Sequence, residues 1–281
     1  MTDVPPVTFA LRMGSMIGCP PFPVLDFDDG ASVALHAVRP LTEALGLRIP
    51  EGTIFDLVQD WERGFPALAE LVQALAYSPM AVGHRGDFVP SELITDEGLL
   101  PAARQVFLRR GACVETLPIS TVAKASGTLT LSDQMKAAKP AFCLAAVIGK
   151  QATGVAKAAA QSVIAGWAIG VEIRAADSAE RPAPGALIIG PNLVPAAFAS
   201  DLSSIPYTMG MMGREVAHGA LSDLSAQMPG FLAEVSAKTT LLPGDLLVIP
   251  ATASPDTPAA GTVDTLEALA SGFGYLKKSF K

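Results

Sequence analysis

The chain has 281 residues, of which 50% are hydrophobic and 17% charged, and its formal net charge is −7. That length can bury a substantial core in one large domain or two modest ones. The sequence pI is near 5.0 and there is no basic run or basic-aromatic patch, so we expect no nucleic-acid partner. Mean hydropathy is high, at +0.39. However, the longest apolar stretches are interrupted by Gly or Glu and are too short to cross a bilayer, so we expect no membrane partner.

Three scattered cysteines, Cys19, Cys113 and Cys143, have no CxxC spacing. An odd number of such cysteines is typical of reduced thiols in a cytoplasm. The first residues, MTDVPPVTFALRMGS, lack the basic stretch and apolar run of a signal peptide. We therefore predict a soluble cytoplasmic protein.

The first third of the chain predicts a small α+β region over residues 1–99. Residues 23–36 contain an acidic glycine turn between two apolar stretches, which predicts a β-hairpin. Residues 55–77 carry apolar side chains at helical spacing, and Gly64 and Pro66 predict a break within this helix or helix pair. Residues 83–90 are polar and predict a loop.

From residue 100 to 281 the pattern becomes β-rich and predicts the main domain. The Ser/Thr/Lys-rich stretch 120–139 predicts a mobile, lid-like loop. Gly213 predicts a hairpin turn. Because there is no strict βαβα alternation, the predicted fold class is a β-dominated α+β fold. Strands are predicted near residues 105–107, 112–115, 186–194, 207–212 and 246–249, and helices near 156–164 and 221–235.

Glu172 is the leading candidate for a site residue, because it lies among apolar neighbours in a strand-like segment. A buried carboxylate is costly unless it is paired, and burial raises its pKa so that it can act as an acid or base. The alternative is a structural ion pair between Glu172 and either Arg174 or Arg181. Arg181 itself can hold a substrate carboxylate in a bidentate fork or simply fill space.

The cysteines and histidines are weaker candidates. Neither Cys113 nor Cys143 has a histidine nearby in the sequence, so we expect inert thiols rather than nucleophiles. His84 lies in a loop that could reach a cavity mouth, His218 is expected in a solvated turn, and His36 on a strand surface. The sequence has no Gly-rich phosphate loop, GxSxG elbow, HExxH motif or Cys/His metal spacing.

Five stretches, in this order, resemble the fumarylacetoacetate hydrolase superfamily, which includes 2-keto-4-pentenoate hydratase-like proteins: FCLAAVIGK, GWAIGVEIRAAD, LIIGPNLVP, GREVAHG and LLPGDLLVIPATAS. The resemblance covers roughly residues 100–281. It implies a twisted mixed β-roll, a homodimer, and a small keto acid or diketone as substrate.

The resemblance also implies a divergent member that lacks most metal ligands. The family binds magnesium, manganese or calcium through a Glu-x-Glu pair and a later acidic residue, and the matched positions here are Ala141, Cys143 and Glu172. A methyl group and a thiol cannot replace two carboxylates for a hard cation. We therefore expect no metal site and no cofactor. The family's Gly-Asn-Tyr segment and catalytic histidine fall on residues 109–117, and its lysine falls near Arg181.

Carried over to this chain, the resemblance gives Glu172 and Arg181 as catalytic residues. Five further residues are expected to contact the substrate: His84, Arg174, Asp177, Asn192 and Thr252.

Three functional hypotheses remain open. The first is a metal-independent hydrolase, hydratase-like lyase or isomerase in which Glu172 transfers a proton and Arg181 replaces the metal ion. The second is a non-catalytic relative that binds a small molecule or stabilises a partner enzyme, since fold alone does not establish function. The third is a hydrolase that uses His84 or a cysteine.

Overall fold

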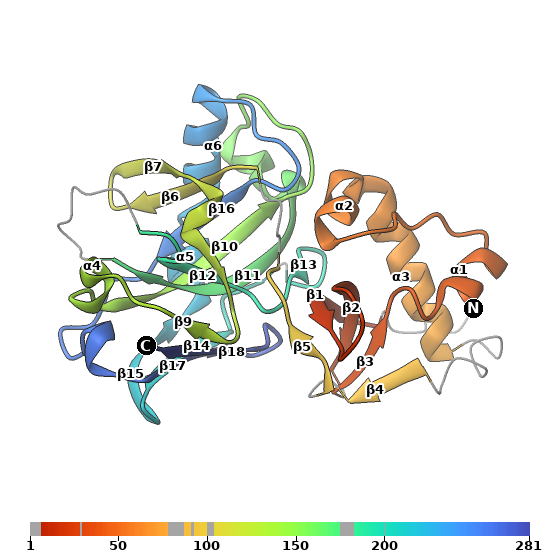
Figure 1. Ribbon diagram of the computed structural model, residues 1–281. Helices are drawn as coiled ribbons and strands as arrows, with labels where there is room; N and C mark the ends of the chain where they lie inside the picture. The colour runs from red at the N-terminus through yellow and green to blue at the C-terminus, as the bar shows by residue number, and fades with distance from the viewer. Residues whose placement is uncertain are drawn as a thin grey trace.

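The computed structural model describes residues 7–28, 30–77, 87–90, 93–99, 104–174, 183–199 and 201–281. Its strands form three sheets, and a smaller number of helices pack around them (Figure 1). The structure confirms the predicted β-dominated α+β class.

The first sheet belongs to the amino-terminal part and is antiparallel, with strand order β4-β3-β2-β1-β5. The predicted hairpin is confirmed as β2–β3, but His36 follows β3 in an exposed turn instead of lying in the strand. Buried Arg12 on β1 pairs with Asp26 at 2.6 Å and Asp96 at 2.7 Å, which joins three of the strands. The strands are β1 (Phe9–Ser15), β2 (Phe22–Phe27), β3 (Ala31–Ala34), β4 (Phe88–Pro90) and β5 (Thr95–Asp96).

Three helices pack against this sheet: α1 (Arg39–Ala44), α2 (Ile54–Gln59) and α3 (Trp61–Tyr77). The predicted break at Gly64 and Pro66 is wrong, because the chain breaks at Asp60 and Pro66 lies inside α3. The carbonyl of Asp60 accepts the Gly64 N–H at 2.8 Å and so starts α3. Pro66 removes one hydrogen bond near the helix start, and the buried leucines further along α3 offset that loss.

Residues 83–86 of the predicted loop at 83–90 lie outside the described part of the chain, and its last residues form β4.

The central sheet has strand order β7-β6-β16-β10-β11-β12-β8, and β13 also pairs with β11. Strands β10 and β11 are buried along their whole length, which explains their near-continuous apolar sequences. The strands are β6 (Val106–Arg110), β7 (Cys113–Leu117), β8 (Val122–Lys124), β10 (Pro140–Ile148), β11 (Ile164–Ile173), β12 (Leu187–Ile189), β13 (Val194–Pro195) and β16 (Leu246–Pro250).

The third sheet packs on one face of the central sheet, where the Phe142 and Tyr207 rings stack with centroids 3.9 Å apart. Its order is β15-β14-β17-β18-β9. The predicted hairpin turn is confirmed: Met212 and Gly213 both have positive φ, at 51° and 71°, between β14 and β15. The strands are β9 (Thr128–Leu129), β14 (Pro206–Met211), β15 (Arg214–Ala220), β17 (Thr265–Ala270) and β18 (Tyr275–Phe280).

The remaining helices are short. The predicted helix at 221–235 is a pair, α5 and α6, with Pro229 in the first turn of α6. These helices are α4 (Asp133–Lys136), α5 (Leu221–Ser225), α6 (Met228–Lys238), η3 (Ile119–Thr121), η4 (Lys157–Val163) and η5 (Ala260–Thr262).

The predicted lid-like loop at 120–139 is wrong. This stretch contains most of η3, then β8, β9 and α4, and it is tied to two sheets because β8 pairs with β12 and β9 pairs with β18. Several of its residues point inward, among them Thr121, Ala125 and Met135, which are buried.

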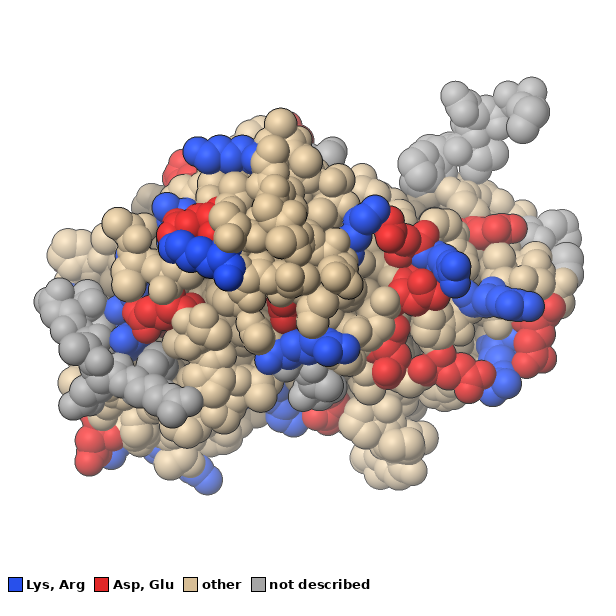
Figure 2. Space-filling view, turned by 90° about the horizontal axis from the view of Figure 1, so that it is seen from above, with Lys and Arg blue, Asp and Glu red and all other residues tan. Residues whose placement is uncertain are grey.

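The amino-terminal part meets the central sheet where β1 lies beside β13 (Figure 1). Leu11 and Leu193 exchange backbone hydrogen bonds of 2.9 and 2.7 Å. On the face shown in Figure 2, acidic and basic side chains are interspersed over the amino-terminal part, at the right of the view. Within the residues that the structure describes, no helix has the length and hydropathy needed to span a membrane.

Candidate functional site

The pairing of β10 with β11 brings together the three positions that the resemblance matches to metal ligands. Ala141 pairs directly with Glu172, and Cys143 pairs with Gly170. Because alternate residues of a strand share a face, all three positions lie on one face of the central sheet. That face packs toward the amino-terminal part, since Cys143 belongs to the same hydrophobic cluster as Leu11.

Glu172 is held by Arg110, which comes from the end of β6. The Nη2 atom of Arg110 lies 2.9 Å from Oε1 of Glu172, and Nε lies 3.1 Å from Oε1 and 3.3 Å from Oε2. The Glu172 side chain is 5% exposed and that of Arg110 is 20% exposed. Such a charge-assisted fork is stronger than a neutral hydrogen bond.

Arg110 is the functional candidate that the sequence analysis missed. The expected partner of Glu172 was Arg174 or Arg181. The structure places Arg110 in that role, and Arg181 lies outside the described residues. One signal in the sequence pointed to the right place, since the segment 109–117 was matched to a functional segment of the family.

A second ion pair adjoins the first. Nη1 of Arg174 lies 2.7 Å from Oε2 of Glu115 on β7, and Nη2 of Arg110 donates to the Arg174 carbonyl at 3.5 Å. The Arg174 side chain is as buried as that of Glu172, and Glu115 is partly exposed. We call Arg110, Glu115, Glu172 and Arg174 the charge cluster; it holds two cations and two anions.

Burial raises the pKa of Glu172, although the positive charges of Arg110 and Arg174 oppose the shift. Its proton therefore comes off closer to neutral pH than that of an ordinary glutamic acid, which suits an acid–base group. Burial also raises the pKa of the Cys143 thiol well above its usual value, and the Glu172 carboxylate adds to that effect. The Cys143 thiol donates to the Ala141 carbonyl at 3.5 Å. A protonated, buried thiol is a poor nucleophile.

The other candidates are scattered or undescribed. Asn192 is buried and lies against Gly274, and Thr252 is exposed in the loop after β16. Cys113 is exposed and pairs with Arg110 at the end of the β6–β7 hairpin. His218 is exposed on β15, with Nδ1 2.9 Å from Oε1 of Glu215, so it lies in a strand and not in a turn. His84, Asp177 and Arg181 lie outside the described residues.

The donor set at the matched positions does not fit a divalent metal ion. Ala141 offers a methyl group, Cys143 a protonated thiol, and both oxygens of Glu172 accept from Arg110. Magnesium, manganese and calcium need several oxygen ligands. Elsewhere in the described ranges, His, Cys, Asp and Glu side chains form no group of three that could hold a metal.

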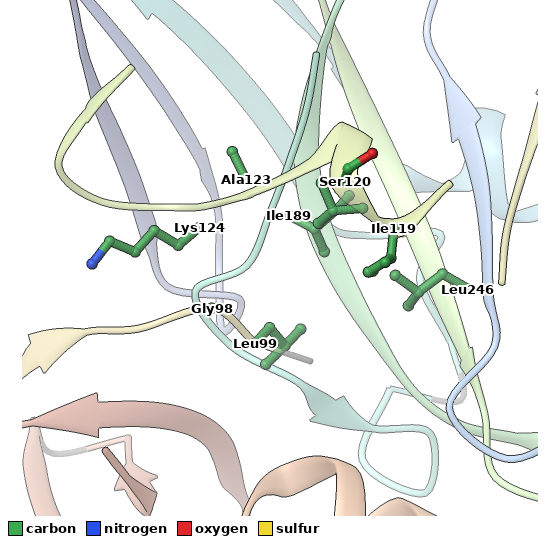
Figure 3. A pocket seen from close by; sticks show the side chains of 9 residues that line it. Gly98, Leu99, Ile119, Ser120, Ala123, Lys124, Ile189 and Leu246 are labelled. Carbon is green, nitrogen blue, oxygen red and sulfur yellow. The ribbon is translucent and has the colours of Figure 1, made fainter. Parts of the chain in front are cut away.

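A cavity of about 310 Å³ lies on the same side of the central sheet (Figure 3). Leu99, Ile119, Ile189 and Leu246 are among its lining side chains. Its volume is near the lower end of the range of about 300–1,000 Å³ typical of small-molecule sites.

Solved structures with this fold come from several enzymes. Maleylpyruvate hydrolase from Sphingobium sp. SYK-6 is 18% identical, with a TM-score of 0.73 over 96% of this chain and 98% of that chain. A second structure of that hydrolase, in complex with manganese(II) and pyruvate, has a TM-score of 0.71 at 18% identity, with the same coverage. The 2-hydroxyhepta-2,4-diene-1,7-dioate isomerase from Mycobacterium marinum is 17% identical, with a TM-score of 0.64 over 97% of this chain and 98% of that chain.

No curated protein matches the sequence. The model of the fumarylacetoacetate (FAA) hydrolase carboxy-terminal family matches residues 116–281, more than half of the 281 residues. That match spans β10, β11 and β16, which build the face carrying Glu172. This chain belongs to the fumarylacetoacetate hydrolase family.

Proposed function

We propose that this protein is an enzyme that moves a proton at the carbon next to the carbonyl of a small 2-oxo acid, without a divalent metal ion. The observation that carries the proposal is the buried Glu172 carboxylate, with its raised pKa, in the fork of Arg110. Membership of the fumarylacetoacetate hydrolase family supports the substrate class. Carbon–carbon bond hydrolysis, hydration and isomerisation all remain compatible with this proton transfer.

In the proposed step, ionised Glu172 accepts a proton from C3 of the oxo acid, and the electron pair of the broken C–H bond forms an enolate. The negative charge then develops on the carbonyl oxygen, where the guanidinium of Arg110 stabilises it. Arg110 is one-fifth exposed, so an anion can reach it. The Glu172 carboxyl then exchanges this proton with solvent, and transfer of a solvent-derived proton from Glu172 to C3 completes the exchange. The roles predicted for His84, Asp177 and Arg181 remain predictions.

The metal-independent part of the proposal rests on the donor set at Ala141, Cys143 and Glu172. The Sphingobium hydrolase structure contains manganese and pyruvate, whereas Arg110 here engages both oxygens of the remaining carboxylate. A fixed guanidinium can stabilise an enolate as a metal ion does, though usually less strongly.

Proton exchange provides a test that does not require the natural substrate. The full chain, treated with EDTA, is incubated with pyruvate or 2-oxobutanoate in D₂O, and loss of the C3 proton signal is followed by NMR. We expect exchange above the buffer rate, and a loss of about 100-fold or more in Glu172→Gln, since positioned general bases contribute about 10²–10⁴-fold.

Two controls make this experiment decisive. Glu234→Gln removes a partly exposed carboxylate on α6 and is expected to leave the rate unchanged. Arg110→Met should lower the rate, and added manganese should not raise it. A full rate in Glu172→Gln, or a rate that appears only with added metal, would reject the proposal.

The alternative function is a non-catalytic protein that binds a small molecule or stabilises a partner enzyme. It is favoured by one specific observation: Glu172 is already paired, as in a purely structural ion pair. No proton exchange with any of several 2-oxo acids, together with co-purification of a second polypeptide, would favour this reading.

We also propose a cytoplasmic homodimer as the working form. Analytical ultracentrifugation of the full chain tests the assembly, and a monomer at micromolar concentration would reject it.

A further inference from the structure

The cavity in Figure 3 and the charge cluster draw residues from neighbouring elements of the fold. On β12, Leu187 pairs with Glu172 and Ile189 pairs with Gly170. Ile189, which lines the cavity, therefore lies on the same face of the sheet as Glu172, two register positions along. Glu172 and the cavity therefore lie on the same side of the sheet.

The segment from β7 to η3 also borders both the charge cluster and the cavity. Glu115 on β7 pairs with Arg174, and η3 follows β7 and brings Ile119 and Ser120 to the cavity. The charge cluster and the cavity are thus both bordered by β12 and by the β7–η3 segment.

The walls of the cavity are mostly uncharged. Lys124 is the one ionisable side chain among the described residues that line it. Its Nζ lies 3.1 Å from Oε2 of Glu97, and in Figure 3 the amine points away from Ile119, Ile189 and Leu246. A carboxylate placed among these described side chains would lose part of its hydration, and the one described cation beside it, Lys124, is already paired with Glu97, which makes the burial costly. A hydrocarbon group would gain from the same burial.

We propose that this cavity binds the hydrocarbon tail of a monocarboxylic 2-oxo acid whose polar head contacts Arg110 and Glu172. This inference rests on the function proposed above and narrows its substrate class. An aliphatic tail of a few carbons suits a cavity of about 310 Å³. The described side chains of the same walls disfavour a second carboxylate at the far end of the substrate.

Isothermal titration of the full chain with oxo acids of increasing length tests the proposal. The series is pyruvate, 2-oxobutanoate, 2-oxopentanoate and 2-oxohexanoate, and 2-oxoadipate matches the last in length but ends in a carboxylate. We expect the Kd to fall about 4-fold for each added methylene, which corresponds to about 0.8 kcal/mol. We expect 2-oxoadipate to bind at least about 10-fold more weakly than 2-oxohexanoate, because its second carboxylate would be desolvated.

A filling substitution ties the effect to this cavity. Ile119→Trp, at a residue that is 36% exposed, should remove the dependence on length and leave the Kd of pyruvate unchanged. Leu269→Trp, at an exposed leucine on β17, is the matched control and should retain the full dependence.

The outcomes separate this inference from the proposed function. Equal Kd values across the wild-type series, or tighter binding of 2-oxoadipate than of 2-oxohexanoate, would overturn the proposal that this cavity binds the hydrocarbon tail. If Arg110→Met loses pyruvate binding in that case, the proposal that Arg110 and Glu172 bind the polar head of the substrate stands. Binding of no member of the series would overturn both. Thermal melting of Ile119→Trp confirms folding, and the wild-type series decides the question if that variant does not fold.

Discussion

Replacing Arg110 by Met leaves a buried carboxylate without its main partner. Glu172 is 5% exposed, so its carboxylate would stay buried while losing the guanidinium that lies closest to it. Removing one partner of a buried ion pair costs about 3–5 kcal/mol. Because Arg110 is itself one-fifth exposed, water already screens part of the attraction, and we expect the lower end, about 3 kcal/mol of unfolding free energy.

The cost in this variant should depend on pH in a definite direction. The pKa of Glu172 is raised by burial, and Arg110 opposes that rise. The contribution of Glu172 to stability is therefore largest below its unfolded pKa and is lost as the pH rises through its folded pKa. Without Arg110 the folded pKa is higher still, so Arg110→Met should lose more stability at pH 8 than at pH 5.

Urea unfolding at the two pH values measures this effect, and Arg109→Met is the matched control. Arg109 has nearly the same exposure, 22%, but its Nη1 lies 3.7 Å from Oε2 of the partly exposed Glu234, and its guanidinium lies 5.7 Å from the Phe231 ring centroid. Such contacts are each worth about 1 kcal/mol or less. Adding Glu172→Gln to Arg110→Met should recover part of the loss. Equal losses for the two arginine variants, or a loss at pH 5 as large as that at pH 8, would refute the reasoning.

Two further predictions concern a buried thiol and a buried amine. In the native protein, Ellman's reagent should label exposed Cys19 and Cys113 quickly and buried Cys143 only on unfolding. The control Cys143→Ala should leave the fast phase of labelling unchanged. Fast labelling of three thiols in the native protein would contradict this prediction. Burial lowers the pKa of Lys278 from 10.5 to about 8. Between pH 8 and pH 10.5 the folded state therefore binds fewer protons than the unfolded state, and the free energy of unfolding should rise with pH by at most about 3 kcal/mol. Lys278→Met should lose this rise, whereas Lys277→Met, at a neighbouring exposed lysine, should keep it; identical pH profiles for all three proteins would contradict the prediction.

Much of the fold could be predicted from local patterns. The β2–β3 hairpin and the turn at Gly213 depend on residues with strong conformational preferences, so they are visible in the sequence. Strands β8 and β9 were missed because they have three and two residues and pair in parallel with distant strands. Such short segments carry no measurable periodicity.

The candidate site, too, could be predicted from the sequence only in part. The sequence by itself determined that Glu172 sits in an apolar strand, because composition is a local property. Its resemblance to the family placed Ala141 and Cys143 at the matched ligand positions, which the strand register then brought beside Glu172. Only the tertiary structure decided which cation meets Glu172. Arg110 is 62 residues away in the chain, and its side chain reaches the carboxylate because β6, β16, β10 and β11 lie side by side in one sheet. Partner choice depends on the order of strands, which no local pattern specifies.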